Sequence, residues 1–203
     1  MNLINSCIKK GTYMKKSIFI IITVLLIFNP YTVYAKHTHQ TQSQTASISI
    51  SLDDLKDDGQ YQYNGLKWKS KLKDVKKKIP YTLKPLKYEN LSANYKEQVY
   101  VANETFNLQG QNAILKLQFV DGELSQFLYA FHLGETYDEW FETQCDNLRQ
   151  LYGEETSWNI NYSSITKMKS QTYRWDLGDT TLQLIMMTGE TINPSATLGI
   201  AEF

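Results

Sequence analysis

The sequence predicts an α+β fold of two helix-plus-antiparallel-sheet units, with the helices packed on one face of the sheet. Two segments, residues 70–79 and 137–152, repeat apolar residues at helical spacing. Asp121-Gly122 separates two stretches rich in alternating apolar residues, which is the strongest short-range signal of a β-hairpin. A block of strand-forming residues follows each helix candidate, so each helix is expected to lie across an antiparallel sheet.

The first 35 residues are expected to be a signal peptide, with Met14 as the true start. Lys15 and Lys16 supply a basic beginning, residues 17–28 form an apolar run, and Ala35 precedes the expected cleavage site. Because this run is shorter than the ~20 residues that span a bilayer, we expect an exported protein without a transmembrane anchor after cleavage.

Residues 36–60 are expected to form a flexible leader, and residues 61–203 a single α+β domain. The leader begins with a stretch rich in Gln, Ser and Thr that has little apolar surface to offset the cost of ordering. Cys145 is the one cysteine that remains after cleavage, because Cys7 lies upstream. An internal disulfide is therefore excluded, and the fold must be held by packing.

The first helix is expected over residues 70–79, with Ser70 as its N-cap and Pro80 as its end. The strands that follow are expected over residues 98–107, 113–120 and 123–132. The second helix is expected over residues 137–152, with a capping box formed by Thr136 and Glu139 and a left-handed C-cap at Gly153. The last strands are expected over residues 160–165, 173–177, 181–187 and 196–203.

Residues 65–70, Gly-Leu-Lys-Trp-Lys-Ser, resemble the Gly-x-x-Trp-Gly-x-Ser opening of small exported bacterial domains, although Lys69 replaces the usual Gly. Leu151-Tyr152-Gly153 is similar to a second landmark of these domains. The arrangement resembles the β-lactamase-inhibitor-like fold, which a small outer-membrane assembly lipoprotein shares. The resemblance covers about ten positions over residues 65–153 and implies a binding module rather than an enzyme.

Charge is distributed unevenly along the chain. After removal of residues 1–35, 17 basic and 21 acidic residues remain, a net charge of −4. Residues 67–87 nevertheless hold nine lysines and one acid, Asp74. This basic segment is interpreted either as the solvated face of an amphipathic helix or as a binding surface for an anionic polymer or membrane. The acidic body and the expected export argue against a nucleic-acid partner.

Two groups of residues are candidate binding residues. One is basic and comprises Lys69, Lys73, Lys76, Lys77 and Lys78. The other is aromatic and includes Tyr129 and Trp175, which belong to a sheet face where a protein partner would find aromatic anchors, unless they are core.

No catalytic set, metal site or cofactor is predicted. Cys145 lies among apolar helix positions and is expected to be buried, and His132 would approach it only through the fold. His37 and His39 alone make a weak metal site in a leader. The sequence therefore predicts an exported, non-catalytic binding protein of the cell envelope or extracellular space. The alternative is a binder of polyanions or anionic membrane surfaces that acts through the lysine-rich helix.

Overall fold

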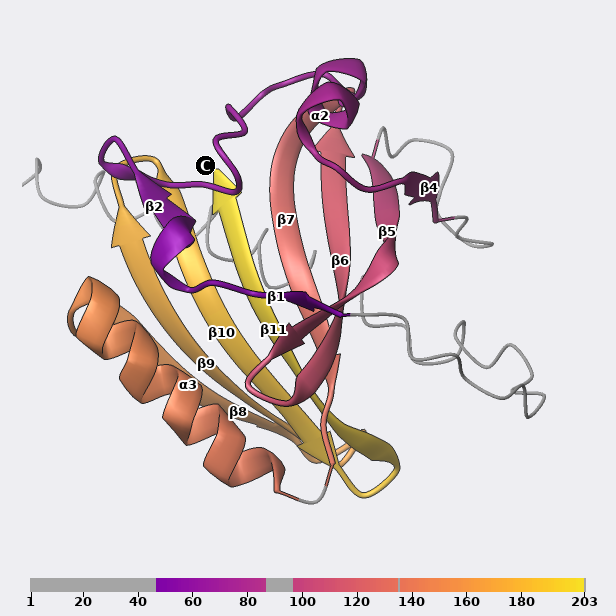
Figure 1. Ribbon diagram of the computed structural model, residues 1–203. Helices are drawn as coiled ribbons and strands as arrows, with labels where there is room; N and C mark the ends of the chain where they lie inside the picture. The colour runs from indigo at the N-terminus through magenta and orange to yellow at the C-terminus, as the bar shows by residue number, and fades with distance from the viewer. Residues whose placement is uncertain (1–46, 87–96, 135, 203) are drawn as a thin grey trace, which may run out of the picture. The chain divides into compact units, whose positions relative to one another are not determined.

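A nine-stranded sheet carries most of the described chain (Figure 1). The structure is a computed structural model that describes residues 47–86, 97–134 and 136–202, all within the compact unit Gln44–Phe203. In chain order the elements are β1 (Ile48–Ser49), the 3-10 helix η2 (Asp53–Leu55), β2 (Lys56–Asp57), β3 (Gln60–Tyr61), α2 (Leu72–Lys78), β4 (Leu83–Pro85), β5 (Glu97–Leu108), β6 (Gln111–Val120), β7 (Glu123–His132), α3 (Tyr137–Tyr152), β8 (Ser157–Ser163), β9 (Met168–Leu177), β10 (Thr180–Gly189) and β11 (Ile192–Glu202). The predicted signal peptide lies outside the described residues.

The strand order is β1-β5-β6-β7-β11-β10-β9-β8, with β4 also paired to β5. Every pairing in this sheet is antiparallel except that of β1 with β5. β7 and β11 join the two runs of strands, and their register places Phe127 opposite Ile200. The two runs therefore form one continuous sheet.

The predicted hairpin is confirmed. β6 and β7 pair around Asp121-Gly122, and both turn residues have positive φ, 51° and 78°. A two-residue turn of this kind needs positive φ at both positions, which Asp tolerates and Gly adopts freely. The Gly178-Asp179 turn between β9 and β10 is confirmed as well.

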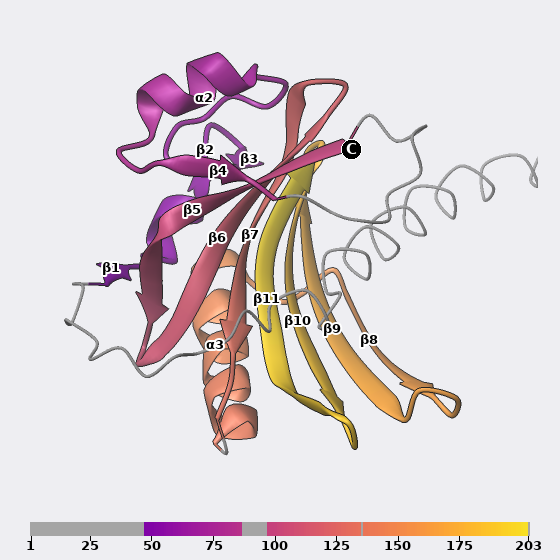
Figure 2. The same ribbon diagram turned by 90° about the vertical axis from the view of Figure 1, so that its right-hand side faces the viewer.

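Helix α3 has the predicted bounds and lies across one face of the sheet (Figure 2). Phe141, Cys145 and Leu148 recur at helical spacing and have no exposed surface. The Phe141 ring lies 5.9 Å from the Tyr173 ring of β9, centroid to centroid. Gly153, at φ 85°, ends the helix, and its N–H donates to the Arg149 carbonyl. The predicted capping box is wrong, because Thr136 makes no side-chain capping hydrogen bond.

Helix α2 is shorter than predicted. It begins after Lys71 rather than Ser70, has no side-chain cap, and buries Val75 within its length. Ile79 adopts an extended conformation ahead of Pro80, so the helix ends at Lys78, one residue before the predicted end. At 1.5 Å per residue, this helix is about 10 Å long, whereas a ten-residue strand is about 34 Å long. Helix α2 is therefore too short to cover a sheet.

The segment before α2 covers part of the face that α2 leaves open. Ile50, Leu52 and Leu55 belong to the hydrophobic core, at 3–8% exposure. Residues 47–60, predicted as part of a flexible leader, therefore belong to the folded unit. Residues 36–46 of that leader lie outside the described residues.

The predicted fold class is wrong in its architecture. Of the described residues, 55% are in strands and 18% are helical, and the sheet is one mixed sheet rather than two helix-covered units. The physical reason is the pairing of β7 with β11, which merges the strand runs. One long helix, α3, and an irregular N-terminal segment then take the place of the two predicted covering helices.

We predict that Leu148→Ala lowers the free energy of unfolding by ~2–5 kcal/mol, because it leaves a cavity at a fully buried position between α3 and the sheet. Leu151→Ala is the matched control on the same helix, since Leu151 is 41% exposed and its truncation should cost well under half as much. Urea denaturation of both variants checks this. Equal losses would contradict the orientation of α3.

Candidate functional site

The lysine-rich segment forms an exposed surface beside the β6–β7 turn. We call it the lysine surface, and it consists of Lys67, Lys69, Lys71, Lys73, Lys76, Lys77 and Lys78, all exposed. Hydrogen bonds fix the segment ahead of α2 to the start of β7: the Lys69 N–H donates to the Leu124 carbonyl, and the Leu124 N–H donates to the Ser70 carbonyl. The part of the surface that carries Lys69 and Lys71 is therefore held against the start of β7.

Three carboxylates partly neutralise this surface. Lys69 pairs with Glu202 at 3.2 Å, Lys71 with Glu123 at 2.9 Å, and Lys77 with Asp74 at 3.6 Å, measured from Nζ to the nearest carboxylate oxygen. Half or more of each lysine side chain in these pairs remains exposed, so each pair contributes at most ~1 kcal/mol to stability. Seven lysines opposite three carboxylates leave the surface positively charged.

The other lysines have weaker neighbours. The Lys76 Nζ lies 5.5 Å from the centre of the Tyr100 ring, and the Lys78 Nζ donates to the Gly65 carbonyl at 3.1 Å. Within the described ranges, Lys67 and Lys73 have no carboxylate partner. Lys73 and Lys77 lie one turn apart on the side of α2 away from the buried Val75. Both side chains therefore lie away from the core, and Lys73 has no carboxylate partner in the described ranges.

The aromatic binding residues predicted on the sheet face are core residues instead. Tyr129 is 4% exposed and Trp175 is 2% exposed, because α3 and the segment before α2 cover their face of the sheet. The indole N–H of Trp175 donates to the Gly153 carbonyl at 2.8 Å. Neither side chain is available to a partner in the folded protein, so the alternative that these aromatics form the core is the correct one.

A small cavity lies between the N-terminal segment and the sheet. Tyr63, Tyr81 and Tyr129 line it together with Asp54, and its volume is about 120 Å³. This is room for a few water molecules, at ~30 Å³ each, and less than the ~300 Å³ that a drug-sized ligand needs. The hydroxyls of Tyr63 and Tyr81 hydrogen-bond to each other, and the Asn64 amide donates to Tyr81 at 3.1 Å.

Burial raises the pKa of all three cavity tyrosines. Their phenols are neutral hydrogen-bonding groups at neutral pH, and burial disfavours their ionisation further. The cavity was not foreseen from the sequence. The alternation of Ile48, Ile50 and Leu52 was a usable signal that residues ahead of Tyr61 approach the sheet.

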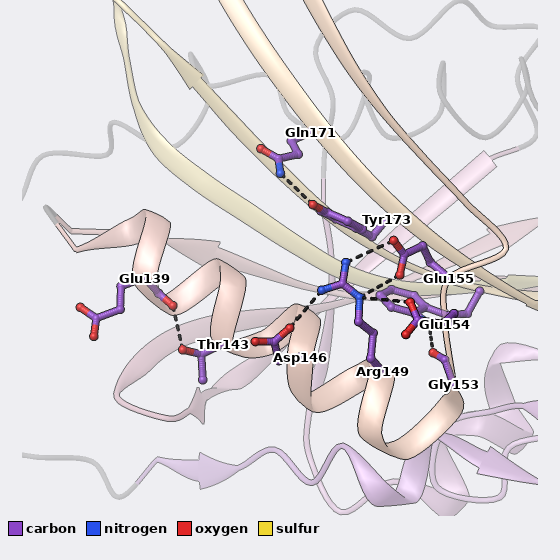
Figure 3. Close-up of polar contacts among 10 residues, drawn as sticks. Glu139, Thr143, Asp146, Arg149, Gly153, Glu154, Glu155, Gln171 and Tyr173 are labelled. Carbon is purple, nitrogen blue, oxygen red and sulfur yellow. Dashed lines mark hydrogen bonds and ion pairs between the residues drawn. The ribbon is translucent and has the colours of Figure 1, made fainter.

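Arg149 joins the C-terminal end of α3 to the chain that leads into β8 (Figure 3). Its Nε and Nη2 donate to the two oxygens of Glu155 at 2.9 and 3.2 Å, and its Nη1 donates to Asp146 at 3.0 Å. Its guanidinium carbon lies 5.3 Å from the centre of the Tyr173 ring. With its donors directed at carboxylates, Arg149 is a structural clamp, which the sequence reasoning missed.

Cys145 is buried, as predicted. Burial, with a smaller contribution from Glu142, raises the pKa of its thiol to about 12, so the nucleophilic thiolate is disfavoured at neutral pH. His132 is exposed at the end of β7, and the structure gives no hydrogen bond between these two described residues. The described ranges contain no group of three or more His, Cys, Asp or Glu side chains that could hold a metal ion. His37 and His39 lie outside those ranges.

No protein-family model, curated protein or solved structure matches this chain. The resemblance to exported β-lactamase-inhibitor-like domains therefore stays a prediction. Neither α-helix of the described residues has the length and apolar character that a membrane crossing requires.

We predict that Glu155→Gln lowers the free energy of unfolding by ~2 kcal/mol at neutral pH, because it removes a charge-assisted pair of hydrogen bonds whose carboxylate is 11% exposed. Glu154→Gln is the matched control, because Glu154 is 88% exposed and 3.8 Å from the same guanidinium. Arg149 lowers the pKa of Glu155 below 4.5, so the difference between wild type and Glu155→Gln should persist above pH 4.5 and fade at lower pH. A constant difference through acid pH would contradict the clamp.

We also predict cooperative alkaline unfolding. Burial raises the pKa of Tyr61 and Tyr152 from 10.0 to about 12, so at pH 10–12 the unfolded chain releases protons that the folded chain retains. Stability is therefore complete below pH 10 and is lost as the pH rises toward 12. Tyrosinate absorbance should rise together with the loss of circular dichroism. Ionisation of all tyrosines while the fold persists would contradict this burial.

Proposed function

We propose that this chain is an exported, non-catalytic binding protein of the cell envelope or extracellular space, and that the lysine surface binds phosphate-rich anionic surfaces. The observation that carries the proposal is the accumulation of seven exposed lysines within twelve residues, in a segment that is hydrogen-bonded to the start of β7. The burial of Tyr129 and Trp175 removes the competing route through an aromatic sheet face.

The chemistry of the surface favours recognition by charge over recognition by shape. Lysine ammonium groups are flexible point charges, which suits a ligand whose phosphates vary in position, whereas bidentate recognition would call for arginine. The existing ion pairs are weak, so a phosphate can replace the carboxylates of Glu123 and Glu202 at little cost. The acidic remainder of the chain, with sixteen acidic and six basic residues from Glu89 onward, would repel the same ligand and orient the protein.

The expected membrane affinity follows from the number of charges. Each lysine near an anionic lipid surface contributes ~1 kcal/mol, so removal of two should weaken binding by ~2 kcal/mol, or about 30-fold. At ~0.5 M salt the screening length falls to about 4 Å and binding should disappear.

We predict this result for Lys73→Gln/Lys77→Gln in cosedimentation with vesicles of mixed anionic and neutral phospholipid. The matched control is Lys167→Gln/Lys169→Gln, which removes the same charge from exposed positions at the β8–β9 turn and the start of β9. Neutral vesicles should bind neither the wild type nor the control. Inorganic polyphosphate added as a competitor distinguishes a soluble polymer from a lipid surface as the preferred source of phosphate.

Equal binding by the two double variants would overturn the lysine surface as the binding site. Binding that survives ~0.5 M salt would overturn the electrostatic mechanism and indicate a specific protein partner. Circular dichroism of both variants confirms that the comparison is between folded proteins.

A further inference from the structure

Within residues 47–86, 97–134 and 136–202, the edge strand β8 has no neighbouring strand on its outer side. It pairs with β9 along its full length, with no interruption in register, and it is the last strand in the order (Figure 2). All seven of its residues are exposed. An edge of this kind presents unpaired backbone N–H and C=O groups that another strand can bind.

Three common protections of an edge strand, a charged residue, a proline and a bulge, are absent from β8. Its sequence, Ser-Trp-Asn-Ile-Asn-Tyr-Ser, contains no charged residue and no proline, and its pairing with β9 contains no bulge. Trp158, Ile160 and Tyr162 are 60%, 49% and 62% exposed, so about half of each of these three large residues remains in water. Pairing with another strand would therefore bury apolar surface that β8 now exposes to water.

These three side chains share one face of the sheet. Strand alternation places them together, and the register pairs Trp158 with Tyr173, whose ring packs on Phe141 of α3. Asn159 and Asn161 lie on the opposite face. The edge thus has an apolar row on the α3 side and an amide row on the other side.

The sequence of β8 is symmetric about Ile160. Reading outward from that residue, asparagine flanks it on both sides, an aromatic residue follows on both sides, and serine ends the strand on both sides. In an antiparallel pair of two copies centred on Ile160, Trp158 faces Tyr162 of the second copy, and Asn159 faces its Asn161. Each residue then meets a residue of its own chemical class.

We propose that β8 is a homodimerisation strand, which pairs antiparallel with β8 of a second copy of this chain about a twofold axis at Ile160. A twofold interface requires a self-complementary patch, and this strand supplies one in its sequence. Two Trp–Tyr cross-strand pairs flank an Ile–Ile pair on the apolar row, and cross-strand pairs of this type stabilise sheets. The uncharged strand brings no like charges together.

We predict that the purified protein associates from monomer to dimer with rising concentration in the micromolar range, measured by sedimentation velocity. Ile160→Arg places two guanidinium groups opposite each other at the axis and should weaken the dimer at least tenfold. Ile165→Arg is the matched control, because Ile165 is 93% exposed and lies beyond the end of β8, and this variant should dimerise like the wild type. Both positions are open to water, so both variants should fold.

A cysteine variant tests the register. In Cys7→Ser/Ile160→Cys, the two introduced thiols face each other across the axis at a Cα separation of ~4.5–5.5 Å, within the range of a disulfide. Oxidised glutathione should therefore link the dimer covalently, whereas Cys7→Ser/Ile165→Cys should remain unlinked. Buried Cys145 is common to both.

A wild type that stays monomeric at its highest soluble concentration would overturn the proposal. So would equal dimerisation of Ile160→Arg and wild type, or equal crosslinking at positions 160 and 165.

Discussion

The fold depends on the pairing of β7 with β11, which lie about sixty residues apart in the chain. This pairing brings Phe127 and Tyr129 beside Ile200 and Leu198 and so assembles one wide apolar face from two separate runs of strands. A face of that width cannot remain in water, and the rest of the chain is arranged to cover it. Helix α3 covers the part near β9 to β11, and the N-terminal segment is held against the remainder.

Aromatic side chains with a polar group anchor these covering segments. Trp140 donates to the Leu108 carbonyl at 3.1 Å, Trp68 to the Tyr61 carbonyl at 3.0 Å, and Tyr152 to the Leu52 carbonyl. Each ring contributes buried apolar area while its N–H or O–H satisfies a backbone acceptor at a junction between elements. The same rings cannot also be a docking face, which explains why an abundance of aromatics here indicates core rather than binding surface.

Features encoded in short stretches of sequence could be predicted, whereas the pairing of distant strands could not. The Asp121-Gly122 turn and the spacing of Phe141, Cys145 and Leu148 are encoded within a few residues, and both elements were predicted closely. The lysine surface was also evident, because charge density is a local property. The β7–β11 pairing and the tyrosine cavity join residues that are far apart in the sequence. The Arg149 clamp lies within residues 146–155, but it depends on how the chain turns after α3, which residue spacing alone does not give. Ser70 and Thr136 show the opposite error, since capping residues in the right place made no cap.

The two edges of the sheet are unequal, and this sets a limit on assembly. β4, which includes Pro85, and β1 occupy the outer side of β5 near Tyr100 to Ala102 and Phe106 to Asn107, so that edge has few backbone groups left to offer. A molecule with one sheet edge that can pair forms a closed dimer, whereas a molecule with two such edges forms an open-ended polymer. If β8 joins two copies as proposed, the short strands β1 and β4 leave the opposite edge with little to offer a third copy, and assembly would stop at the dimer.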